Sequence, residues 1–133
     1  MSETAVFAKY VAAMLRMGQS DPDKARVAIQ AQGDQVLAGL RHALRPSTRD
    51  SEKMVALIEM YLYTTLEMLV RATRSDDRIE FGEAEMKAWA VAGALDRAAD
   101  AMLAEDRDTA VAAMVSAEAV LGIDLSSLYR RDF

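Results

Sequence analysis

The sequence predicts an all-α protein: an antiparallel up-and-down bundle of four to five helices in one domain, residues 1–133. Alanine and methionine, both strong helix formers, number 25 and 9, against 6 glycines and 2 prolines. Apolar residues recur every three or four positions over long stretches, and no stretch alternates for long as a strand would. A chain of 133 residues can bury one core, whereas two domains would each be too small to do so comfortably.

The first two predicted helices cover residues 3–17 and 20–44. Gly18 is a natural end for the first, and Ser20 is a suitable N-cap for the second. Pro46 ends the second helix, because the residue before a proline avoids the helical conformation. In the first helix, six apolar residues repeat at helical spacing and predict a buried face: Val6, Phe7, Tyr10, Val11, Met14 and Leu15.

The third predicted helix, residues 51–74, is the most apolar, and such a helix is usually the central one of a bundle. Glu67 and Arg71 lie on its polar face as a favourable i,i+4 pair. Its longer apolar stripe consists of Met54, Ile58, Tyr61, Leu62 and Leu69, and its shorter one of Leu57, Met60 and Met68.

The fourth and fifth predicted helices cover residues 82–105 and 109–121. Polar residues at 75–78 form a turn before the fourth, and Gly122 ends the fifth. Residues 123–133 form a short tail with four apolar side chains. The fourth helix carries Met86, Trp89, Ala90, Gly93, Ala94, Leu95, Ala98 and Met102.

Charge and composition exclude several classes of function. A net charge of −5 and a pI near 4.9 argue against nucleic acid, whose phosphates require a cationic surface. The absence of cysteine excludes disulfides, zinc fingers and thiol catalysis. No apolar run reaches membrane-spanning length and the first residues do not resemble a signal peptide. We therefore expect a cytoplasmic protein that does not bind membranes.

No catalytic, cofactor or metal site is predicted. His42 is the only histidine, which excludes the paired-histidine motifs of di-iron bundles and zinc proteases. It lies among arginines near a predicted helix end, where a solvated histidine is favoured by the helix dipole. The acidic residues Glu80, Glu83 and Glu85 complement the start of the fourth helix in the same way.

Binding to another protein is the function that remains. Methionine side chains adapt to varied apolar partners, so we predict Leu57, Met60 and Met68 as a partner-binding stripe, and Trp89 as an interface anchor. The alternative for each is packing, since methionine also fills gaps in a core and one tryptophan can lock helices together.

Two segments of the chain have a composition that is found together in a known family. In the first, Asp21, Lys24 and Ala25 are followed by spaced apolar residues, and in the second, Tyr61-Leu62-Tyr63 is followed by Leu69. These segments resemble the second and third helices of the flagellar secretion chaperone family. The resemblance spans about residues 21–89 and lacks the family's first-helix motif. It implies a cytoplasmic helix bundle that wraps the disordered tail of a secreted filament subunit.

The sequence therefore predicts a chaperone-like or adaptor-like bundle that sequesters an apolar helical or disordered segment of a partner protein. A structural or regulatory subunit that acts through homodimerisation, by its third helix or tail, is the first alternative. A metal-free bundle enzyme is the second. Its nearest candidate residues are Glu67, Arg71, Arg74 and Lys87, although their spacing does not single them out.

Overall fold

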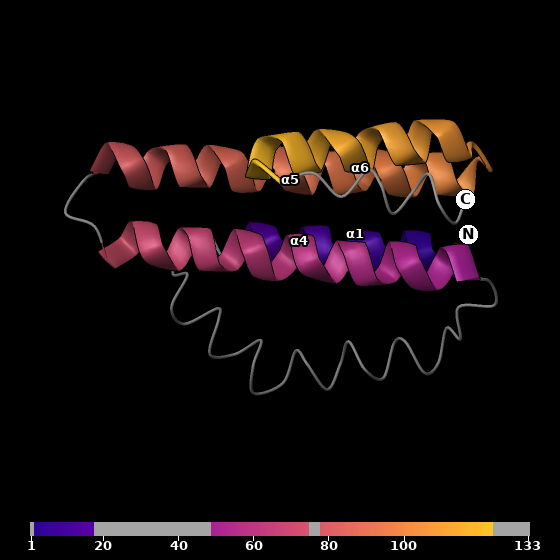
Figure 1. Ribbon diagram of the computed structural model, residues 1–133, viewed down its shortest axis with the longest axis horizontal. Coiled ribbons are helices and arrows are strands. Elements are labelled where there is room, and N and C mark those ends of the chain that lie inside the picture. Colours follow the sequence, from indigo (N-terminus) through magenta and orange to yellow (C-terminus); the bar gives the residue numbers. More distant parts are fainter. Residues whose placement is uncertain (1, 18–48, 75–77, 124–133) are drawn as a thin grey trace.

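The computed structural model describes residues 2–17, 49–74 and 78–123, and these form a bundle of helices (Figure 1). The helices are α1 (Ser2–Met17), α4 (Arg49–Arg74), α5 (Arg78–Leu103) and α6 (Arg107–Leu121). No strand occurs within these ranges, so the all-α prediction is confirmed. The predicted helix at 20–44, with His42, and the tail from residue 124 lie outside the described residues.

The last three helices alternate in direction, as in an up-and-down bundle. α4, α5 and α6 follow one another in opposite directions, and α1 runs antiparallel to α5 (Figure 1). α5 packs most extensively, against α1 and α6, and it also contacts α4. The helix predicted at 51–74 corresponds to α4, which contacts α1, α5 and α6. The buried side chains of α5 are mostly alanine, which lets neighbouring helices approach closely.

The core of α4 follows its predicted periodicity. All five members of the longer apolar stripe are fully buried: Met54, Ile58, Tyr61, Leu62 and Leu69. They meet Val91, Leu95 and Met102 of α5 and Met114 of α6 in one main cluster, apart from Leu69, which belongs to a second, smaller cluster.

The buried face of α1 is rotated from the predicted one. Phe7, Val11 and Leu15 are fully buried as expected. Val6 is 50% exposed, however, and Tyr10 is also exposed, so the prediction is wrong for these two. Alanines at positions 5, 8 and 12 are buried instead. The sequence prediction chose the face with the larger apolar side chains. The structure buries the alanines because they let α1 pack closer to the bundle.

The hairpin of α4 and α5 extends beyond the other two helices. α4 and α5 have 26 residues each, against 16 in α1 and 15 in α6. At 1.5 Å per residue, the longer pair exceeds the shorter by about 15 Å. The projecting end (Figure 1) has its own small core of Leu69, Ala72, Ala84 and Ala88, flanked by Met68 and Phe81.

A buried carboxylate connects α6 to α4. Glu118 is 2% exposed, and the Tyr61 hydroxyl donates a hydrogen bond to its Oε2. A carboxylate removed from water requires such donors, because an unpaired buried charge is very costly. The pair therefore fixes the position of α6 along α4 more specifically than apolar contacts alone.

α6 has well-formed caps at both ends. The Asp106 carboxylate accepts hydrogen bonds from the Thr109 backbone N–H at 3.1 Å and from the Thr109 hydroxyl at 2.6 Å. Gly122 ends the helix in the left-handed conformation at φ 71°, which glycine adopts without strain. The structure thus begins α6 at Arg107, two residues before the predicted start.

Replacing Tyr61 by Phe tests the buried pair. We expect the free energy of unfolding to fall by about 1–3 kcal/mol, because Glu118 loses a buried donor. Tyr10→Phe is the matched control: Tyr10 is exposed on α1, and its variant should unfold like the wild type. Urea titrations of the three proteins measure the difference. Equal stability of Y61F and wild type would contradict the assignment.

The cap of α6 predicts a pH dependence. The Thr109 hydroxyl and then its backbone N–H hold the pKa of Asp106 below its ordinary value of 3.8. The stabilisation is therefore complete above pH 3.8 and is lost as the pH falls through the lowered pKa. Asp106→Ala should lower the melting temperature at neutral pH, and its difference from wild type should shrink in strong acid. A difference that stays constant from pH 7 to about pH 2 would contradict the role of the charge.

Candidate protein-binding site

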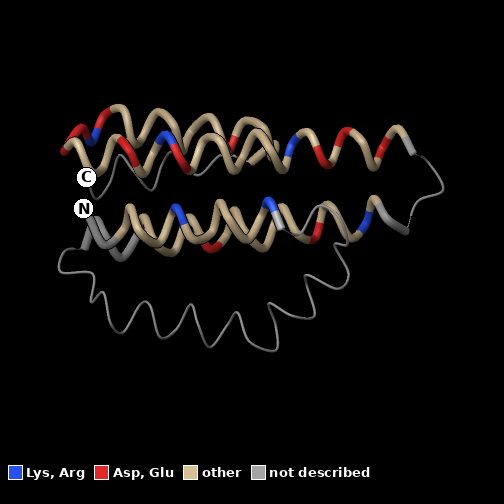
Figure 2. Tube along the Cα trace, turned by 180° about the vertical axis from the view of Figure 1, so that it is seen from behind, with Lys and Arg blue, Asp and Glu red and all other residues tan. Residues whose placement is uncertain are grey.

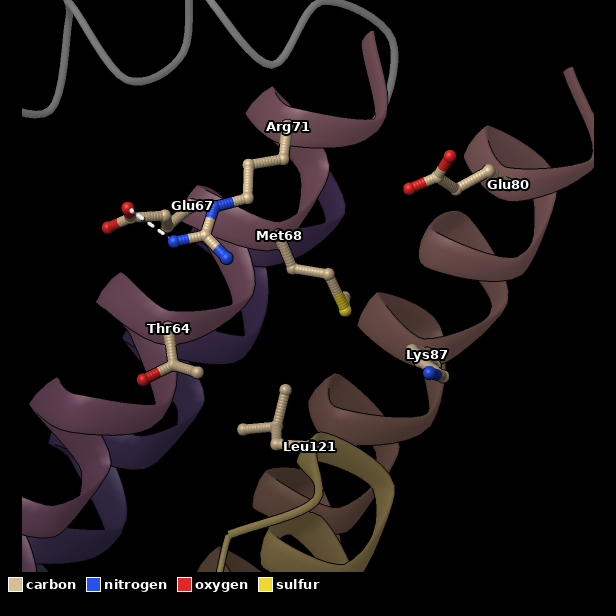
Figure 3. Close-up of a pocket in the computed structure, with 7 residues that line it drawn as sticks. All are labelled: Thr64, Glu67, Met68, Arg71, Glu80, Lys87 and Leu121. Atoms are coloured by element: carbon tan, nitrogen blue, oxygen red, sulfur yellow. Dashed lines mark hydrogen bonds and ion pairs between the residues drawn. The ribbon is translucent and has the colours of Figure 1, made fainter. Parts of the chain in front are cut away.

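A pocket opens where the projecting hairpin leaves the rest of the bundle (Figure 3). It has a volume of about 560 Å³ and lies between α4 and α5, with Leu121 of α6 at one end. The mismatch in helix length produces it, because α6 stops at Leu121 while α4 and α5 continue. Its lining comprises Thr64, Glu67, Met68, Arg71, Glu80, Lys87 and Leu121.

The pocket has an apolar floor and a charged rim. The Met68 side chain points from α4 into the space towards α5, and Leu121 lies below it (Figure 3). On one side of the rim, Arg71 Nη2 lies 3.4 Å from Glu67 Oε1. Glu80 and Lys87 come from α5 on the other side. The rim thus holds two acidic and two basic groups around an adaptable thioether.

The pocket brings together three of the four residues named as candidates for a bundle enzyme, namely Glu67, Arg71 and Lys87. The side chains of Arg71 and Glu67 are 77% and 67% exposed. Charges so well solvated act weakly on a reacting group, since electrostatic catalysis relies on a site that excludes water.

The three residues of the predicted partner-binding stripe occupy different environments. Leu57 is 2% exposed and belongs to the main core, so its prediction as a contact residue is not supported by its position. Met60 is 45% exposed on the outer face of α4. Met68 is half-buried in the pocket. Leu57 lies where α4 is flanked by other helices, whereas Met68 lies beyond the end of α6.

Trp89 lies on the surface of α5. It is 54% exposed, and the Arg16 guanidinium lies 5.8 Å from the centre of its ring. Arg16 also pairs with Asp96, and Lys9 lies 3.1 Å from Asp100. These contacts join α1 to α5 beside the indole. Trp89 does not line the pocket that contains Met68.

Metal ligation is not supported by the described residues. In ranges 2–17, 49–74 and 78–123, no three acidic or histidine side chains converge to hold an ion. Within the same ranges, no helix has the length and apolarity needed to span a bilayer. α5 begins at Arg78, four residues before the predicted start, so of the three acidic residues predicted to complement its start only Glu80 lies in the first turn, where the helix dipole favours it, and Glu83 and Glu85 follow that turn.

Comparison with known proteins identifies no relative. No family model, no curated protein and no solved structure matches this chain. Function must therefore be inferred from the site itself.

Sequence reasoning missed Thr64, Leu121 and the pocket position of Glu80. These residues belong to three helices, and only the packing of helix ends brings them together. The one available signal was the difference in predicted lengths between the fifth helix and the third and fourth. That difference implied an uncovered hairpin end, although not which side chains would line it.

Paired substitutions test the environments of Leu57 and Met60. Leu57→Ala should lower the free energy of unfolding by about 2–5 kcal/mol, because it leaves a cavity in the main core. Met60→Ala should change it by no more than about 0.5 kcal/mol, as for other surface positions. Thermal or urea unfolding of both variants gives the comparison. Similar losses for the two would contradict the described packing of α4.

Proposed function

We propose that this protein is a chaperone-like or adaptor-like bundle that holds an apolar helical or disordered segment of a partner protein in the Met68 pocket. The observation that carries the proposal is the open pocket itself, with an apolar floor and a rim of mixed charge. It lies at the projecting end of the α4–α5 hairpin, where a partner has free access among the described residues.

The dimensions of the pocket suit a few side chains of a partner. Its volume of about 560 Å³ is within the usual range for ligand pockets. Met68 is unbranched and polarisable, so it adapts to apolar groups of different shapes. This property is useful to a protein that holds an extended segment without requiring one fixed fold.

The charges of the rim favour an amphipathic segment. Arg71 and Lys87 accept acidic groups, and Glu67 and Glu80 accept basic ones. A partner with one or two apolar residues flanked by charges of both signs would satisfy floor and rim together. Exposed rim charges contribute modestly to affinity and more to orientation, so most binding energy would come from contacts with Met68 and Leu121.

The resemblance to flagellar secretion chaperones indicates one class of partner, the disordered tail of a secreted filament subunit. A cytoplasmic location would follow from that role. An adaptor for another cytoplasmic protein is compatible with the same pocket. Identification of the partner separates the two.

Site-specific photocrosslinking from position 68 in the native cell, followed by mass spectrometry, identifies the bound segment. That segment, made as a peptide, is then titrated calorimetrically against wild type and Met68→Ser. Losing an apolar contact of this size should weaken binding about tenfold or more. Leu103→Ser is the control, because Leu103 is an apolar residue 58% exposed on α5 and does not line the pocket.

The expected result is a specific crosslinked segment whose affinity falls in M68S and not in L103S, with both variants folded by circular dichroism. Equal affinity of all three proteins for the segment would overturn the assignment of the pocket. A crosslink to a filament subunit would support the flagellar chaperone role, and one to another protein a general adaptor.

A further inference from the structure

α5 carries a second surface that the proposed function does not use, an apolar stripe on its solvent side. The members are related by steps of three, four and seven residues, which place them on one face of the helix. Ile79 and Met86 are each 73% exposed, and Trp89 is 54% exposed. We call this the α5 stripe: Ile79, Gly82, Met86, Trp89, Ala90 and Gly93.

The two glycines leave hollows in this stripe. A Cβ atom added at Gly82 would meet nothing within 4 Å. One added at Gly93 would meet only Nη1 of Arg97, at 3.6 Å, and that group is the end of a flexible side chain. No backbone of the described helices approaches either position. The stripe therefore offers large apolar side chains beside open hollows, a pattern suited to receiving another helix.

We infer that the α5 stripe binds the same stripe of a second copy of this chain, with the two α5 helices antiparallel about a twofold axis near Trp89 and Ala90. In such an interface each contact occurs twice, with residue i against residue j and j against i. A stripe can pair with itself only when its two halves are complementary in size and charge. The α5 stripe meets both conditions.

The size condition is met by Met86 and Gly93. They lie equally far from the midpoint between Trp89 and Ala90, on opposite sides of it. In antiparallel helices, Met86 of one copy is therefore level with Gly93 of the other, where the hollow receives its side chain. Trp89 is next to the midpoint, so the two indoles meet across the axis, in the central position where tryptophan contributes most to interfaces.

The charge condition is met by Glu83 and Arg97, both exposed on the flank of the stripe away from Arg16 and α1. Acidic residues occur in both parts of α5 (Figure 2), Glu80, Glu83 and Glu85 in the first and Asp96 and Asp100 in the second. Asp96 and Asp100 already pair with Arg16 and Lys9 of α1, whereas Arg97 is the basic group that this part of α5 presents. The antiparallel arrangement places Glu83 of one copy within one residue of the level of Arg97 of the other. A parallel arrangement would instead place Glu83 opposite Glu83.

Charge reversal tests the interface. Glu83→Arg and Arg97→Glu should each weaken dimerisation at least about tenfold, because each places like charges opposite one another twice. The double variant E83R/R97E should restore the wild-type dissociation constant to within about threefold. Within one chain the two residues are 14 positions apart on a helix, about 21 Å. Restoration therefore cannot arise inside a single molecule.

Sedimentation equilibrium of the full chain over a range of concentrations gives the dissociation constants, and circular dichroism confirms that each variant folds. Glu105→Arg is the matched control, since it makes the same change of charge at an exposed position outside the stripe. It should dimerise like wild type. A monomeric wild type, or a double variant as weak as the singles, would overturn the inference.

Discussion

The close approach of α1 and α6 to α5 is the constraint on which the rest of the bundle depends. The buried residues of α5 are mostly alanines, interrupted by Val91, Leu95 and Met102. Small side chains shorten the distance between helix axes, so larger residues on the neighbouring helices can fill the remaining space. The need for close helix packing also explains why the alanines of α1 face the core. Large buried side chains accordingly come from the helices around α5 as well as from α5 itself, among them Phe7 and Leu15 of α1, Tyr61 and Leu62 of α4 and Met114 of α6.

The difference in helix length then determines where the two candidate binding surfaces lie. α4 and α5 continue past the ends of α1 and α6, and the exposed hairpin keeps a small core of its own. Its edge towards α6 is the Met68 pocket, whereas the outer side of α5 carries the apolar stripe. The two surfaces are thus parts of one helix pair, the first a pocket and the second an apolar stripe along α5. Occupation of one leaves the other accessible in the described bundle.

Polar side chains buried in the largely apolar core add specificity to its packing. The Tyr61–Glu118 hydrogen bond requires one position of α6 relative to α4, because a shift along the helix would leave the carboxylate without this donor. That position also sets where α6 ends, with Leu121 at the pocket. The location of the pocket therefore depends on the Tyr61–Glu118 hydrogen bond, because Glu118 lies about one helical turn before Leu121 on α6.

The sequence by itself determined the helical class, the approximate limits of the described helices and the buried stripe of α4, because all three follow from local periodicity and capping. It also indicated Met68 and Trp89 as apolar residues of interest. It did not show that Leu57 is core, that Val6 and Met86 are exposed, or that Glu67, Arg71 and Lys87 meet at one pocket. Periodicity ranks the faces of a helix by apolar content, but which face is covered depends on where neighbouring helices lie and end. Only the tertiary structure decided that.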